Sequence, residues 1–117
     1  IYEALGLAFL MSEKLEEARD AFGKAIELEP DAIGPRLQRA RVLAVEGNRD
    51  DALTDIDRAL DLEPDNPAAL LLRARINQQA GDDDAALADV ETVLETAPDL
   101  PAALELRGLI AAERGNF

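Results

Sequence analysis

Apolar side chains recur along the chain at intervals of three and four residues, which is the period of an amphipathic helix. Each segment with this pattern is short and is followed by a proline or by a polar or glycine-containing turn. Residues that favour strands are scarce, so we expect an all-α fold without a sheet. The pattern predicts helices from Ile1 to Met11, after Lys14 up to Pro30, from Pro35 to Gly47, after Asp51 up to Pro64, from Pro67 to Gly81, after Asp84 up to Pro98, and from Pro101 to Arg114.

The whole pattern returns every 34 positions. The stretch from Leu37 to Arg41 matches the stretch from Leu71 to Arg75, and prolines stand at positions 30, 64 and 98. Small residues recur in the same register, at Gly6, Ala40, Ala74 and Gly108 and again at Ala18, Ala52 and Ala86. One helical hairpin per period predicts repeats over about 1–32, 33–66 and 67–100, with a half repeat over 101–117. We expect these repeats to form a single domain that is a fragment of a longer protein.

The first repeat carries a family resemblance. The residues Tyr2-x2-Leu5-Gly6-x2-Phe9, followed by Ala18, Phe22, Ala25 and Pro30, resemble the tetratricopeptide repeat, and the match extends over the whole chain. The resemblance implies a right-handed superhelix, or solenoid, of antiparallel helix-turn-helix repeats whose first helices line a concave groove. Other helical-hairpin repeats are the alternative, but their usual periods or glycine placements fit less well.

Composition excludes several classes of function. The chain has no Cys and no His, so thiolate catalysis, Ser-His-Asp triads and ordinary zinc sites are excluded within it. A net charge of −13 argues against nucleic acid and anionic membranes as partners. We find no glycine-rich phosphate loop and no apolar run near the roughly 20 residues of a membrane span. We therefore expect neither catalysis nor a cofactor, and the Ala, Asp, Arg and Leu bias is typical of high-GC bacteria.

Charge is divided unevenly between the two kinds of helix. If residues 1–12, 33–46, 67–80 and 101–117 are the first helices, they hold seven arginines and four glutamates, a net charge of +3. Since the whole chain has a net charge of −13, the remaining residues carry a net charge of −16. The groove-lining side is therefore expected to be mildly basic and the second-helix side strongly acidic.

The resemblance also implies which residues form the groove surface, namely first-helix residues that point away from the second helix. These are Glu3, Leu7, Leu10, Met11, Leu37, Gln38, Arg41, Ala44, Val45, Leu71, Leu72, Arg75, Gln78, Gln79, Glu105, Leu106, Leu109 and Glu113. Arg41 and Arg75 hold equivalent places and would grip a carboxylate or backbone carbonyls of a bound peptide. The alternative is that both only offset the acidic body, although leucines beside them favour binding.

Arg39 and Arg73 differ from this pair. The first repeat has Leu5 at the equivalent position and Ala21 sixteen residues later, whereas Arg39 is followed at that spacing by Asp55 and Arg73 by Asp89. In an antiparallel hairpin these positions approach each other, so we expect two structural ion pairs rather than a ligand site. Mutation of Arg39 or Arg73 should therefore cost stability, and mutation of Arg41 or Arg75 should cost binding.

A run of three aspartates, Asp82-Asp83-Asp84, follows Gly81. Its spacing lacks the alternating oxygen ligands, central glycine and terminal glutamate of a calcium-binding loop. Because it opens a helix, we expect it to cap free N–H groups rather than to bind metal.

These observations favour a protein-interaction module that binds a peptide or helix of a partner protein. The alternatives are a spacer or self-association segment, homo-oligomeric through the apolar terminal helix, or a regulatory arm of a larger, enzymatic protein. Chaperone-binding members of the resembled family hold a C-terminal carboxylate with Lys, Asn and Arg on successive first helices. The matching places here are Glu3, Leu7, Gln38, Ala68 and Leu72, so this clamp is absent.

Overall fold

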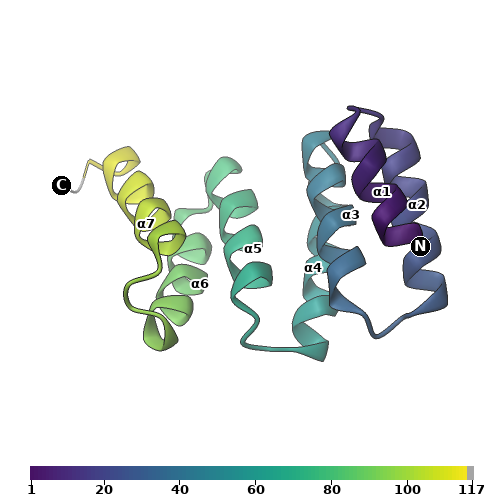
Figure 1. Cartoon of the computed structure of the whole chain (residues 1–117). Coiled ribbons are helices and arrows are strands. Elements are labelled where there is room, and N and C mark those ends of the chain that lie inside the picture. Colours follow the sequence, from purple (N-terminus) through teal and green to yellow (C-terminus); the bar gives the residue numbers. More distant parts are fainter. Residues whose placement is uncertain (116–117) are drawn as a thin grey trace. The chain divides into compact units, whose positions relative to one another are not determined.

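The computed structural model describes residues 1–115, which form seven α-helices and no strand (Figure 1). The helices are α1 (Tyr2–Met11), α2 (Leu15–Leu28), α3 (Ile33–Val45), α4 (Arg49–Leu62), α5 (Pro67–Gln79), α6 (Asp83–Thr96) and α7 (Pro101–Glu113). The predicted all-α fold class is confirmed, and α2, α4 and α6 begin at residues 15, 49 and 83, one 34-residue period apart. The last two residues of the predicted half repeat, 116 and 117, lie outside the described residues.

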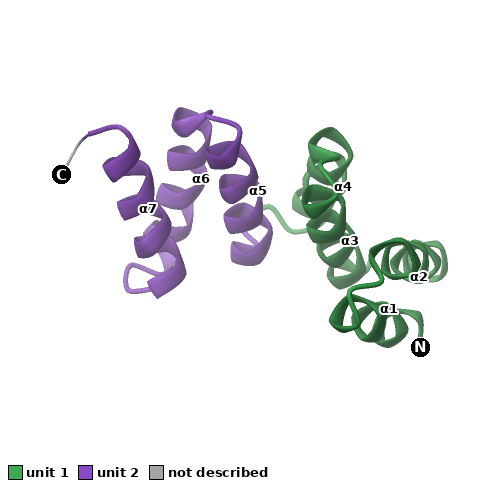
Figure 2. Ribbon diagram, turned by 90° about the horizontal axis from the view of Figure 1, so that it is seen from above, with its two compact units in different colours: residues 1–64 green, residues 65–117 purple. Residues whose placement is uncertain are grey.

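The chain divides into two compact units, residues 1–64 with α1 to α4 and residues 65–117 with α5 to α7 (Figure 2). In the first unit α1 packs against α2 and α3, and α3 also packs against α2 and α4. The centre of this unit is a cluster of Ala18, Phe22 and Val42, all fully buried. Gly6 allows the close approach, because a Cβ atom at this position would lie 2.5 Å from the Phe22 ring. Gly6 is thus a point where α1 meets α2.

The second unit is a hairpin of α5 and α6 with α7 packed against both. Ala74 and Ala86, the equivalents of Gly6 and Ala18, are fully buried, as are Val90 and Ile110. Pro67 stands at the start of α5, where its missing N–H costs no helical hydrogen bond. The unit is therefore built on the same contacts as the first.

The three hairpin turns share one backbone conformation. Glu13, Gly47 and Gly81 have φ values of +62°, +87° and +87°, and stand 34 residues apart. In each turn the next amide donates to the carbonyl five residues earlier, from Lys14 to Phe9 at 2.8 Å in the first turn. This is the pattern of a helix that ends in a left-handed residue, a position that glycine occupies without steric cost.

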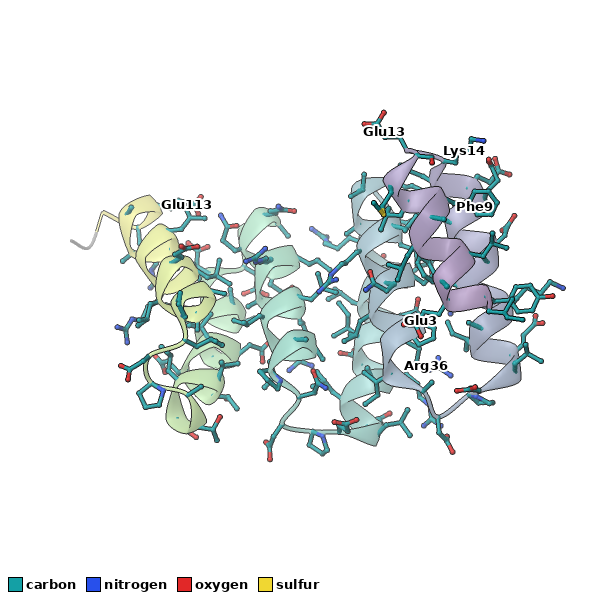
Figure 3. The ribbon with its side chains drawn as sticks, in the orientation of Figure 1. Glu3, Phe9, Glu13, Lys14, Arg36 and Glu113 are labelled. Carbon is teal, nitrogen blue, oxygen red and sulfur yellow. The ribbon has the colours of Figure 1, made fainter. Side chains whose placement is uncertain are left out.

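The first turn therefore carries a strained residue, since Glu13 stands where the other two turns have glycine (Figure 3). We expect Glu13→Gly to raise the free energy of unfolding by about 0.5–1 kcal/mol, because the left-handed conformation is costly for a residue with a Cβ atom. Urea denaturation followed by circular dichroism measures this change. The reverse substitution, Gly47→Glu, should destabilise the chain, and equal stability of both variants would contradict this interpretation.

The aspartate run opens α6, as predicted. Asp82 is the N-cap residue, and its Oδ1 atom accepts a hydrogen bond from the Ala85 amide at 3.3 Å. The equivalent Asn48 makes no such bond at α4, although α4, like α6, has two aspartates in its first turn. In residues 1–115 no three acidic side chains gather in a geometry suited to a metal ion. No helix of this part of the chain has the length and apolar character that crossing a bilayer requires.

Candidate functional site

A hollow of about 260 Å³ lies between α5 and α7 in the second unit. Its lining residues are Arg75, Gln78, Gln79, Ala102, Glu105, Leu106 and Leu109. All of them come from first-type helices, and all except Ala102 are among the residues expected on the groove surface. The hollow therefore brings together side chains of two successive first helices, among them Arg75 and Leu109, which hold the same repeat position 34 residues apart.

The chemistry of this hollow is mixed. Arg75 is exposed and makes no hydrogen bond or ion pair with any residue of the described chain. Gln78 donates from Nε2 to Oε1 of Glu113 at 2.7 Å, a bond that joins α5 to the end of α7. Leu109 is 48% exposed and adds an apolar wall. An unpaired guanidinium beside an exposed leucine suits a ligand that carries both an acidic and an aliphatic group.

The first unit presents the equivalent residues of its own first helices. Arg41 is exposed, and its Nη1 atom lies 3.4 Å from Oε1 of Gln38, a long hydrogen bond. Leu7, Met11 and Val45 are exposed apolar residues on α1 and α3. This surface thus combines one weakly held arginine with aliphatic side chains, as the second unit does.

The expected groove residues differ in exposure. Those that are exposed are Leu7, Met11, Arg41, Val45, Arg75, Gln79, Glu105, Leu109 and Glu113, and those that are half-buried are Glu3, Leu10, Gln38, Ala44, Leu71, Leu72 and Gln78. The remaining two, Leu37 and Leu106, are buried, with 7% and 5% of their surface exposed. These two side chains therefore offer little surface to a partner, although Leu106 lines the hollow between α5 and α7. Because α3 packs against three helices and α7 against two, more than one side of each helix is covered.

Two bidentate ion pairs occur at the predicted spacing. Arg39 donates from Nε and Nη2 to the carboxylate of Asp55 at 2.7 and 2.6 Å. Arg73 makes the same two bonds to Asp89 at 2.7 and 2.8 Å. Both aspartates are buried, whereas each arginine side chain keeps about a third of its surface exposed. These contacts were expected from the sequence, and their structural role remains a prediction.

The hydrogen bonds to Asp55 raise the pKa of the Arg39 guanidinium above its ordinary value, against the opposing effect of burial. A group with a raised pKa in the folded state contributes stability below its unfolded pKa and loses it as the pH rises through the folded value. This contribution is therefore fully present at neutral pH. It is lost only in strongly alkaline solution.

Comparison with known proteins identifies the kind of repeat. Tetratricopeptide-repeat family models match residues 37–101 and residues 1–32. No curated protein sequence shows significant similarity to the chain.

Several solved structures have the same fold. A tetratricopeptide repeat protein from Parabacteroides merdae is 24% identical, with a TM-score of 0.90 over 98% of this chain and 45% of its own. The chain thus spans less than half of that protein. The first tetratricopeptide-repeat domain of Spaghetti (RPAP3), bound to the HSP90 peptide SRMEEVD, is 23% identical, with a TM-score of 0.87 over 97% of this chain and 90% of its own. YrrB, described as having an unusual peptide-binding site, is 22% identical, with a TM-score of 0.84 over 92% of this chain and 55% of its own.

Proposed function

The chain belongs to the tetratricopeptide-repeat family, and we propose that it is a protein-interaction module that holds a peptide or helix of a partner on the surface of its first helices. The observation that carries this proposal is the hollow between α5 and α7, in which the unpaired Arg75 stands beside the exposed Leu109. Two of the structures with the same fold support it, since one binds a peptide and the other has a peptide-binding site.

The lining of the hollow defines the ligand. Arg75 would bind a carboxylate through two parallel N–H donors, and Leu109 would cover an aliphatic side chain next to it. Gln79 is exposed and offers both a donor and an acceptor to a peptide backbone. Arg41 plays the corresponding part in the first unit. The favoured ligand is therefore a segment with an acidic residue close to an aliphatic one.

The peptide SRMEEVD bound by the RPAP3 domain also has acidic residues next to aliphatic ones, but this chain lacks the clamp for a terminal carboxylate. The chain has Glu3, Leu7 and Gln38 at three of the places where chaperone-binding relatives carry the Lys, Asn and Arg of a carboxylate clamp. A glutamate at the first place repels a terminal carboxylate. We therefore do not propose the HSP90 peptide as a ligand of this chain.

The proposal includes the organisation of the chain and the absence of catalysis. The repeats over about 1–32, 33–66, 67–100 and 101–117 form a single binding domain without cofactor or reaction of its own. The 34-residue spacing of its helices supports this division.

Charge reversal at the two arginines tests the proposal. Peptides are first selected from a random display library with the intact chain, and their affinities are then measured by fluorescence polarisation. We expect the double variant Arg41→Glu with Arg75→Glu to bind at least about tenfold more weakly, since a hydrogen bond to a charged group contributes about 1.5–3 kcal/mol. Its helicity by circular dichroism should be unchanged, because both side chains are exposed.

The matched control is Arg58→Glu with Arg107→Glu, which makes the same charge change at two exposed arginines, one in each unit, outside the hollow between α5 and α7. It should bind the selected peptides as the unaltered chain does. If the two double variants bind equally well, or if the library yields no enriched peptide, the proposed function is wrong.

A further inference from the structure

A second, larger hollow lies in the first unit, on the side of the second helices. It has a volume of about 610 Å³ and is bounded by α2 and α4, with Arg39 and Leu43 of α3 between them. None of its lining residues belongs to the surface proposed above for the peptide. A ligand bound in this hollow would therefore share no contact residue with the peptide on the first helices.

A glycine opens this hollow. A Cβ atom added at Gly23 of α2 would meet only Nη1 of Arg39, at 3.6 Å. The residues one and two periods further on are Asp57 and Glu91, so the first repeat has no side chain where the other two have an acidic one. The gap is thus specific to the first repeat.

The same gap leaves a hydrogen-bond donor available. Arg39 uses Nε and Nη2 to hold Asp55, whereas Nη1 has no partner among residues 1–115. A half-buried N–H group of this kind is satisfied by water or by an acceptor such as a peptide carbonyl. Gly23 leaves the room that a peptide backbone would need to reach it.

The walls of the hollow carry an excess of acidic charge. Arg39 is neutralised by Asp55, with a weaker attraction to Asp51, and Arg19 is paired with Glu46 at 2.7 Å. Of the remaining charged lining residues, three are acidic and one is basic: Asp20, Glu27, Asp51 and Lys24. Asp20 comes from α2 and Asp51 from α4, so acidic groups stand on both walls. The local field therefore attracts a cation and repels an anion.

We propose that the hollow between α2 and α4 binds a basic peptide segment, with an arginine or lysine side chain between Asp20 and Asp51 and a backbone carbonyl on Nη1 of Arg39. The carbonyl site and the acidic walls together distinguish this hollow from the rest of the acidic second-helix surface. The occupant is a segment of a protein partner, distinct from the acidic and aliphatic segment bound by the first helices.

Nuclear magnetic resonance tests the site with defined probes. The probes are the neutralised tripeptides acetyl-Gly-Arg-Gly-amide and acetyl-Gly-Glu-Gly-amide, titrated into the intact 15N-labelled chain at about 50 mM NaCl, where screening is moderate. We expect the arginine peptide to shift amide resonances of residues 19–27 and 51–55 and the glutamate peptide to shift none of them. Shifts spread evenly over α2, α4 and α6 would show only general attraction to acidic charge and would overturn the proposal.

Three variants separate shape from charge. Gly23→Gln fills the gap without changing charge, and Asp20→Asn with Asp51→Asn removes the wall charges while keeping their shape. Each should weaken binding of the arginine peptide at least about fivefold, which corresponds to about 1 kcal/mol. The control, Asp61→Asn with Glu95→Gln, removes two exposed acidic groups elsewhere on the second helices. It should change the affinity for the arginine peptide by less than about twofold. Unaltered binding by Gly23→Gln, or an equal loss in the control, would contradict the site.

Discussion

Replacement of Arg39 by leucine is expected to lower the free energy of unfolding by about 2–3 kcal/mol, because it leaves the buried carboxylate of Asp55 without a cation. The value lies below that for a fully buried pair, since the Arg39 side chain keeps 29% of its surface exposed. Chemical denaturation followed by circular dichroism measures the loss. Arg58→Leu, at an exposed position of α4, is the matched control and should change stability by less than about 0.5 kcal/mol.

The first repeat suggests how to restore this stability. It has Leu5 and Ala21 at the positions of Arg39 and Asp55, so the repeat tolerates an apolar pair as well as an ionic one. Asp55→Ala added to Arg39→Leu should therefore recover at least about half of the loss, because no buried charge is left unpaired. The double-mutant cycle should give a coupling free energy of about 1–2 kcal/mol. Additive losses would show that the two residues do not act as a structural pair.

Gly6→Ala and Gly108→Ala are expected to have opposite effects, although both residues hold the same repeat position. At Gly6 the new Cβ atom would lie 2.5 Å from the ring of Phe22, which is fully buried, so the ring must move. We expect a net loss of about 1–2 kcal/mol, since overpacking exceeds the gain from alanine in a helix. At Gly108 nothing lies within 4 Å, and the same substitution should stabilise α7 by about 0.5–1 kcal/mol.

Thermal unfolding of the two glycine variants, in parallel with the unaltered chain, shows in one experiment whether each substitution raises or lowers stability. A rise in stability for Gly6→Ala would mean that the α1–α2 contact is looser than the structure has it. A fall for Gly108→Ala would mean that the exposed side of α7 is covered in solution.

Much of the fold could be predicted from the sequence, because the helix period, the turn residues and the 34-residue offset all point to the same elements. The offset also located the Arg39–Asp55 and Arg73–Asp89 contacts, since two residues sixteen apart in an antiparallel hairpin must approach each other. The left-handed Glu13 was not foreseen. Its own chemistry does not favour that conformation, and only its register with Gly47 indicates it.

The candidate site could be predicted only in part. The position of a residue in the repeat suggests which side of the helix it occupies, but exposure also depends on how many neighbours the helix has. Leu37 and Leu106 are buried, although Leu71 and Leu72 at the same repeat positions are half-buried. Ala102 was missed because a small side chain gives no chemical signal, although it lines the hollow. The gap at Gly23 is visible in the sequence only when the three repeats are aligned with one another.

The proposed function places a partner peptide against Arg75 and Leu109, and the most direct test is to map where a library-selected peptide binds. Amide resonances of the 15N-labelled chain should shift on α5 and α7, around residues 75–79 and 105–109, and the shifts should disappear in Arg75→Glu. Shifts confined to α4 and α6, or unchanged binding by Arg75→Glu, would contradict the assignment of the first helices as the binding surface.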